Sequence, residues 1–89
     1  MPQVRIPTPL RPHAGGKDSV ETEGSTVGEV LGHLGRAYPA LKERIFDGDE
    51  LRRFVNVYVN NEDIRYLDEL DTTVGTTDEV SIIPAVAGG

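Results

Sequence analysis

Apolar and polar residues alternate in short stretches near the N-terminal end of the chain, as they do in half-buried β-strands. Residues 3–7 and 19–22 have this pattern, and Pro12, Gly15 and Gly16 supply turn residues between them. The sequence therefore predicts an N-terminal β-hairpin with a long connecting loop. Because proline cannot donate a backbone hydrogen bond, Pro7 predicts that the first strand ends at a sheet edge or a bulge.

Two further strands are predicted in the C-terminal half. Residues 54–60 carry β-branched side chains at one parity and Phe, Asn and Tyr at the other, and residues 79–83 form the last strand, which Pro84 ends. Asn60 and Asn61 tolerate the positive φ of a tight turn. The irregular connection between these strands has apolar residues that we expect to cover one side of it: Ile64, Leu67, Leu70 and Val74.

One amphipathic helix is predicted between these two pairs of strands. Thr26 and Glu29 have the spacing of a capping box, and Pro39 stops the helix. Its apolar face consists of Val27, Val30, Leu31, Leu34 and Tyr38. Three glycines inside the helix each cost about 1 kcal/mol relative to alanine, so the helix must be stabilised by packing on a sheet.

The order of elements predicts an α+β domain over residues 1–84, with one main helix on one face of a mixed sheet of four to five strands. Strand parity directs one set of side chains toward the helix, namely Val55, Val57, Val59, Val80 and Ile82. Leu41, Ile45 and Phe46 indicate a short second helical turn at the edge of the core, and residues 47–50 form an acidic turn.

Phe54, Tyr58 and Ile83 have the opposite parity and are predicted to lie on the outer face of the sheet. Exposed aromatic residues often mark an interface, so we interpret these residues as a partner-docking face. The alternative is that residues 62–74 cover them. Arg52 and Arg53 beside Phe54 could orient a partner or could form a solvated basic pair.

Composition narrows the classes of function. The chain has 89 residues, a net charge of −6 and no cysteine, which excludes a disulfide framework, a thiolate metal site and a cysteine nucleophile. The charge argues against nucleic acid and favours partners with basic surfaces. With only His13 and His33 as imidazoles, we expect no metal site and no catalytic site.

No apolar run approaches the roughly 20 residues of a membrane span, and no signal peptide is visible, so we expect no membrane association and a cytoplasmic location.

The C-terminal end is small, uncharged and free of turn signals. After Pro84 the chain reads Ala85, Val86, Ala87, Gly88 and Gly89. We expect residues 85–89 to form a flexible, extended tail, because two final glycines leave no Cβ beside the terminal carboxylate and suit a narrow channel in a partner. The alternative is an ordinary frayed chain end.

Several stretches together resemble the ThiS/MoaD family of bacterial sulfur carriers, which have the β-grasp, ubiquitin-like fold. The resemblance covers essentially the whole chain and is carried by residues 26–31, 54–60 and 78–80 and by Pro84 with Gly88-Gly89. Within the family the chain looks most like the carriers of thiocarboxylate-dependent cysteine biosynthesis, because of residues 6–8, 10–12, 15–16, 53–56 and 84–89. One departure is Thr77, where the family usually has glycine before Asp78-Glu79.

The resemblance implies that this chain is a protein cosubstrate and not an enzyme. An E1-like activating enzyme would adenylate the Gly89 carboxylate with ATP, and a sulfur donor would then convert it to a thiocarboxylate. The segment from Pro84 to Gly88 would enter the partner, and the partner that the resemblance favours is a cysteine synthase that uses pyridoxal phosphate, while the carrier itself binds no cofactor. Three alternatives remain: the small subunit of molybdopterin synthase, acting with the large subunit; a ubiquitin-like modifier that forms isopeptide bonds; and a β-grasp binding module with an inert tail.

Overall fold

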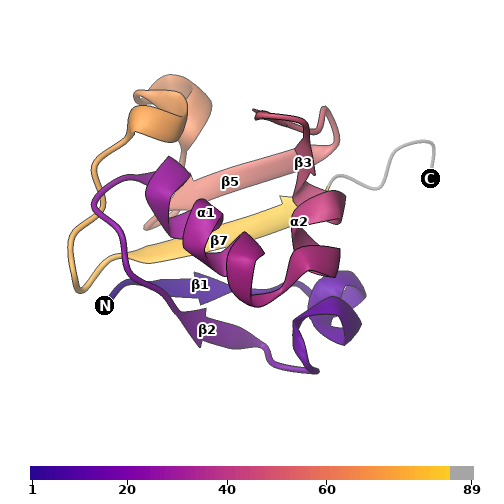
Figure 1. Cartoon of the computed structure of the whole chain (residues 1–89). Coiled ribbons are helices and arrows are strands. Elements are labelled where there is room, and N and C mark those ends of the chain that lie inside the picture. Colours follow the sequence, from indigo (N-terminus) through magenta and orange to yellow (C-terminus); the bar gives the residue numbers. More distant parts are fainter. Residues whose placement is uncertain (85–89) are drawn as a thin grey trace.

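A five-stranded mixed sheet with helices on one face makes up the fold of this protein, seen in a computed structural model that describes residues 1–84 (Figure 1). Its strand order is β2-β1-β7-β5-β6. The strands are β1 (Gln3–Arg5), β2 (Ser19–Glu21), β5 (Val55–Val59), β6 (Glu62–Asp63) and β7 (Glu79–Pro84). The helices α1 (Val27–Ala37) and α2 (Pro39–Ile45) cover one face, and a small hairpin of β3 (Phe46–Asp47) and β4 (Glu50–Leu51) follows α2. This is the predicted β-grasp architecture.

The first strand lies inside the sheet, and the expected edge or bulge near Pro7 is wrong. β1 pairs with β2 in antiparallel and with β7 in parallel orientation, and it ends at Arg5, before the proline. The chain then enters a 3₁₀ helix, η1 (Thr8–Ala14), which buries Leu10 and Ala14 and ends at Gly15 with φ 66°. Because Pro7 lies outside the ladder, its missing donor costs the sheet nothing.

Helix α1 begins at the predicted cap. The Thr26 hydroxyl accepts a hydrogen bond from the Glu29 backbone N–H at 3.2 Å, and Glu29 in turn accepts from the Ser25 N–H at 2.8 Å. The return bond thus reaches one residue further back than in a standard capping box. The helix ends at Ala37, and Pro39 begins α2. Phe46, which we expected in the second helical turn, instead starts β3.

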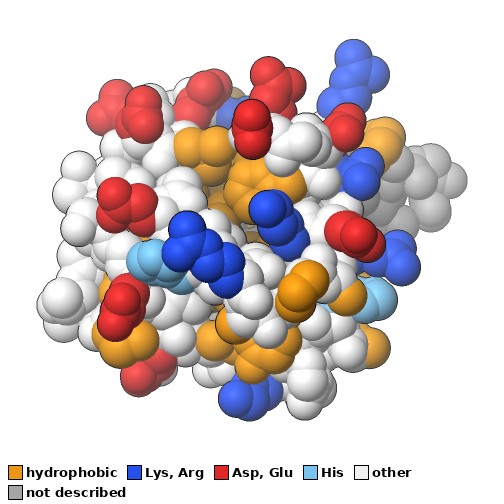
Figure 2. All heavy atoms as spheres, viewed as in Figure 1, with side chains coloured by type: hydrophobic (Ala, Val, Ile, Leu, Met, Phe, Trp, Pro, Cys, Tyr) orange, Lys and Arg blue, Asp and Glu red, His pale blue; other side chains and the backbone are white. Residues whose placement is uncertain are grey.

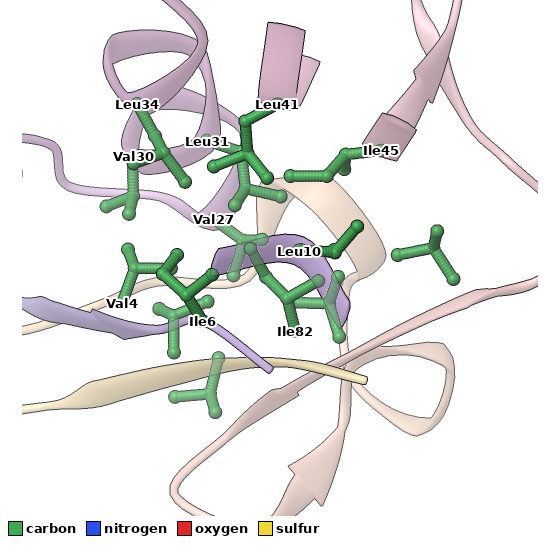
Figure 3. Close-up of a cluster of buried hydrophobic side chains, with 14 of the residues drawn as sticks. Val4, Ile6, Leu10, Val27, Val30, Leu31, Leu34, Leu41, Ile45 and Ile82 are labelled. Atoms are coloured by element: carbon green, nitrogen blue, oxygen red, sulfur yellow. The ribbon is translucent and has the colours of Figure 1, made fainter. Parts of the chain in front are cut away.

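The core lies between the helices and the inner face of the sheet. Figure 3 shows Val27, Val30, Leu31 and Leu34 of α1 gathered above Val4, Ile6 and Ile82. All the inward residues predicted from strand parity are buried: Val55, Val57, Val59, Val80 and Ile82. Their alternation along β5 and β7 therefore defines which face of the sheet the helices cover.

The crossover between β6 and β7 packs against the start of α1. It contains two 3₁₀ helices, η2 (Ile64–Tyr66) and η3 (Glu69–Asp71). The Val27 N–H donates to the Thr72 carbonyl at 3.0 Å, and the Val74 N–H donates to the Ser25 carbonyl at 2.8 Å. Ile64 and Val74 are buried and Leu70 is half-buried, but Leu67 is 39% exposed. The expectation that Leu67 covers the connection is therefore wrong, because the irregular backbone turns this side chain outward.

Candidate functional site

The described chain ends at the centre of the sheet. β7 lies between β1 and β5, and its last residue, Pro84, is paired with Val55 at the start of β5. Figure 1 shows this end of β7 beside α2 and β3. Whatever follows Pro84 is therefore attached to a strand that pairs with β1 over Glu79–Ser81 and with β5 as far as Pro84. The tail residues Ala85, Val86, Ala87, Gly88 and Gly89 lie outside the described residues.

Tyr58 and Ile83 lie on the side of the sheet that faces away from the helices, as predicted, whereas Phe54 precedes β5 and lines a groove with Glu43 and Arg44 of α2. Phe54 is 54% exposed and Ile83 is 46% exposed, while Tyr58 is half-buried. In the register of β5 with β7, Tyr58 lies opposite Ser81 and Ile83 opposite Asn56. A polar cross-strand partner leaves Ile83 exposed on this face.

Phe54 precedes the strand that we expected to contain it. β5 starts at Val55, whose N–H donates to the Arg52 carbonyl at 3.1 Å and closes a turn around Phe54. Phe54 consequently lies at the corner where the chain enters β5, next to the end of β7. The alternative that residues 62–74 cover all three side chains is wrong for Phe54 and Ile83, which are exposed, because Thr72 and Val74 of that segment pack at the start of α1. Tyr58 is half-buried and lies opposite Asp63 of that segment.

An ion pair lies next to Tyr58 at the edge strand. Asp63, the β6 residue opposite Tyr58, accepts from Arg65 Nη2 at 2.7 Å and from Arg65 Nε at 3.1 Å. The Arg65 backbone N–H also donates to Asp63, at 2.9 Å. These hydrogen bonds hold the pKa of Asp63 below its ordinary value and raise the pKa of Arg65. Both groups stay charged at neutral pH, so this pair fixes η2 and is not an acid–base catalyst.

Sequence reasoning missed Tyr66, which is 86% exposed and is the most exposed large hydrophobic residue in the range 1–84. It follows the buried Ile64 by two residues in η2. The available signal was the spacing Asp63-Ile64-Arg65-Tyr66, in which Asp63 caps a turn that buries Ile64 and points Tyr66 outward.

A groove of about 510 Å³ opens beside the end of β7, lined by Glu43, Arg44, Arg52, Phe54, Val55 and Pro84. A second hollow of about 320 Å³ lies between the β3–β4 hairpin, β5 and the η2–η3 segment. Acidic side chains follow the upper rim of the molecule in Figure 2, and hydrophobic side chains lie beneath them. Across residues 1–84, no group of three or more His, Asp or Glu side chains is placed to hold a metal ion, and no helix is long and apolar enough to cross a membrane.

The comparisons with known proteins agree with the fold and extend over the tail. The model of the ThiS family matches residues 4–89. The chain belongs to the ThiS family.

Individual relatives of this ThiS-family chain are carriers and modifiers by name. It is 48% identical to the sulfur carrier protein CysO of Mycobacterium tuberculosis over 89 residues, which cover 97% of this chain and 96% of the relative. It is 37% identical over 67 residues to small archaeal modifier protein 3 of Haloferax volcanii, covering 75% and 73% of the two chains. A chain in the crystal structure of the Amycolatopsis orientalis BexX/CysO complex superposes with a TM-score of 0.92 and 44% identity, with full coverage of both chains. These relatives support the prediction of a carrier protein and not an enzyme.

Proposed function

We propose that this protein carries sulfur as a thiocarboxylate on Gly89. The observation that carries the proposal is the near-full-length similarity to a protein named as a sulfur carrier, together with a family match that extends to Gly89. The pairing of Pro84 with Val55 supports it, because a group that must enter a partner's channel benefits from a fixed starting point at the end of β7.

The proposed chemistry starts with an unreactive carboxylate. A Gly89 oxygen attacks the α-phosphorus of ATP on an E1-like activating enzyme, pyrophosphate leaves, and an acyl-adenylate forms. Sulfide then attacks the carbonyl carbon and expels AMP, which takes one carboxylate oxygen with it, so that oxygen is replaced by sulfur. The proposed acceptor is a cysteine synthase that uses pyridoxal phosphate. ATP and pyridoxal phosphate belong to the partners, and the carrier supplies only the tethered sulfur nucleophile.

Docking would use the outer face of the sheet. Phe54 and Ile83 expose apolar surface next to Pro84, so a partner that covers them also receives the segment from Pro84 to Gly88 from the same direction. Burial of such side chains contributes about 1.5–3 kcal/mol each when desolvation is complete. Contacts with the docking face would thus raise the affinity of the partner and also orient the tail for entry into its channel.

Intact-mass spectrometry tests the proposal. The protein is incubated with ATP, a sulfide source and an extract that contains its activating enzyme. We expect a gain of about 16 Da, the difference between sulfur and oxygen, on the C-terminal peptide. A chain lacking Gly89 is the control and should show no gain. An unchanged mass of the full chain, in an extract that activates a known ThiS-family carrier, would refute the proposal.

A second candidate function is protein modification. It is favoured by the similarity to the small archaeal modifier protein, because isopeptide formation requires the same activated C-terminal glycine. Immunoblots of the host extract would then show higher-mass conjugates that depend on Gly89 and survive reducing agents. The third possibility, action as the small subunit of molybdopterin synthase, predicts co-purification with a large subunit and sulfur transfer to a molybdopterin precursor.

A further inference from the structure

Two arginines lie beside Pro84, where the described chain ends. Arg44 of α2 and Arg52, which follows β4, line the groove beside Phe54 and Pro84. Figure 2 shows Lys and Arg side chains along the right-hand side of the molecule, and Figure 1 places the end of β7 on that side. The whole chain has 15 acidic and 9 basic residues, so these cations oppose its net charge. We call Arg44 and Arg52 the tail-root arginines.

Arg52 is held in place by the end of α2. Its backbone N–H donates to the Ile45 carbonyl at 2.9 Å, and its Nε donates to the Glu43 carbonyl at 2.8 Å. Within residues 1–84 its two terminal nitrogens make no hydrogen bond or ion pair. The guanidinium is therefore oriented by one of its donors, while the others remain available in an exposed position. A fixed guanidinium fork matches the geometry of a carboxylate.

No ion pair within residues 1–84 neutralises either arginine. Glu43 is the acidic residue of residues 1–84 that lines the groove, and Arg52 also lines the second hollow with Asp49 and Glu50, but none of these carboxylates forms an ion pair with Arg44 or Arg52. The other lining residues, Phe54, Val55 and Pro84, are apolar. Apolar walls beside two cations favour a ligand that presents carboxylates next to an apolar contact. This is the composition of the rim of a protein interface.

Resting on the proposed function, we propose that the tail-root arginines bind acidic side chains of the activating enzyme at the mouth of the channel that receives the tail. The activating enzyme is the partner that every use of Gly89 requires first. An acidic patch on an enzyme would be repelled by the chain's net charge of −6 and attracted where Arg44 and Arg52 lie. The activating enzyme would then bind the carrier preferentially in the orientation in which Pro84 faces the channel. Net charge alone favours basic partner surfaces, but at this groove the arrangement of charges favours acidic ones.

Charge reversal tests the role of the arginines. In the double variant Arg44→Glu/Arg52→Glu, we expect kcat/KM for ATP–pyrophosphate exchange with the activating enzyme to fall at least about 10-fold at low salt. The loss should lie in KM, because Gly89 is unchanged and the saturated rate is not affected. It should shrink as ionic strength rises, since screening weakens the repulsion.

A matched control separates the local effect from net charge. Lys17→Glu/Arg36→Glu makes the same change in net charge at exposed positions outside the groove, and should keep kcat/KM within about 2-fold of the wild type. The single variant Arg44→Glu separates an effect on binding from an effect on folding, because no hydrogen bond or ion pair joins the Arg44 side chain to residues 1–84. It should still raise KM severalfold.

Equal losses in the two double variants, or a wild-type KM in Arg44→Glu/Arg52→Glu, would overturn the assignment. A change in the titration of the Gly89 carboxylate of the isolated Arg52→Glu chain would also overturn it, because the arginine would then bind the chain's own terminus. If the wild-type chain itself supports no exchange, the proposed function fails together with this inference. That outcome can be told from all the others because the wild-type chain then shows no ATP–pyrophosphate exchange.

Discussion

The side-chain amide of Asn60 donates a hydrogen bond to Asp78 Oδ1 at 2.8 Å and so joins the turn after β5 to the turn before β7. Asn60 Oδ1 also accepts from the Glu79 N–H at 3.0 Å, and Asp78 Oδ2 accepts from the Gly75 N–H at 2.7 Å. Asn60 has φ 49°, a conformation that Asn tolerates. These bonds fix the register of β5 and β7 at the end of the sheet opposite Pro84.

The same bonds predict an acid-sensitive contribution to stability. Donation from Gly75 and Asn60 holds the pKa of Asp78 below its ordinary value of 3.8 in the folded chain. The contribution is therefore present above pH 3.8 and is lost as the pH falls through the lowered folded value. In urea titrations between pH 2 and 5, Asp78→Asn should take up fewer protons than wild type on unfolding, because the variant lacks this carboxylate. Asp49→Asn, in the exposed β3–β4 turn, is the control and should keep the wild-type pH dependence; a flat wild-type profile would contradict the prediction.

Two glycine-to-alanine substitutions should have opposite signs. At Gly24, which has φ 147°, a Cβ would lie 2.7 Å from the Val30 backbone nitrogen and 2.8 Å from its Cγ2. We expect Gly24→Ala to destabilise the fold by about 2 kcal/mol. At Gly32, inside α1, a Cβ would meet nothing within 4 Å, so Gly32→Ala should stabilise by about 0.8 kcal/mol. Denaturant unfolding measures both, and equal effects would contradict the packing described around Gly24.

Two leucines should differ strongly in their response to truncation. Leu34, on the buried face of α1, is 0% exposed, whereas Leu67 is 39% exposed in the crossover. Leu34→Ala should lower the free energy of unfolding by about 3 kcal/mol, because it removes buried contacts and leaves a cavity. Leu67→Ala should cost less than about 1 kcal/mol. A large loss at Leu67 would show that the crossover buries this side chain in solution.

The docking face makes a prediction about kinetics and not stability. Phe54→Ser and Ile83→Ser should each lower kcat/KM with the activating enzyme by about 10-fold, since a partner loses apolar contact area. Their melting temperatures should stay within about 3 °C of wild type because both side chains are exposed. Tyr66→Ser is the control, since it removes a more exposed aromatic side chain from η2, outside β5 and β7. If Tyr66→Ser is as damaging as Phe54→Ser, the interface is not the one predicted.

The parts of the fold that sequence predicted are those governed by local chemistry and simple periodicity. The alternation of residues 54–60 separates Val57 from Tyr58 onto opposite faces, and Thr26 with Glu29 marks the start of α1. Even the replacement of glycine by Thr77 has little effect, because Thr77 does not adopt a positive φ and the bonds of Asp78 close the turn instead.

The parts that sequence did not predict depend on distant contacts. Residues 8–14 have no periodic pattern that predicts η1. This helix is stabilised by burial of Leu10 and Ala14 in the core and by the hydrogen bond that Arg11 Nε donates to the Ile6 carbonyl at 3.1 Å. The sequence likewise did not predict the groove at the end of β7. Arg44 and Arg52 become neighbours of Pro84 only because the β3–β4 hairpin returns the chain toward β5.

The parallel pairing of β1 with β7 has a consequence for synthesis of the chain. Gln3, in the first strand of the domain, is paired with Glu79, in its last strand. The sheet lacks its middle strand until Glu79–Pro84 has been synthesised, so the domain can finish folding only after nearly all of its residues have left the ribosome. A chain truncated before β7 would have no complete sheet. An activating enzyme that docks on the assembled sheet would therefore select molecules that contain β7, without any separate proofreading step.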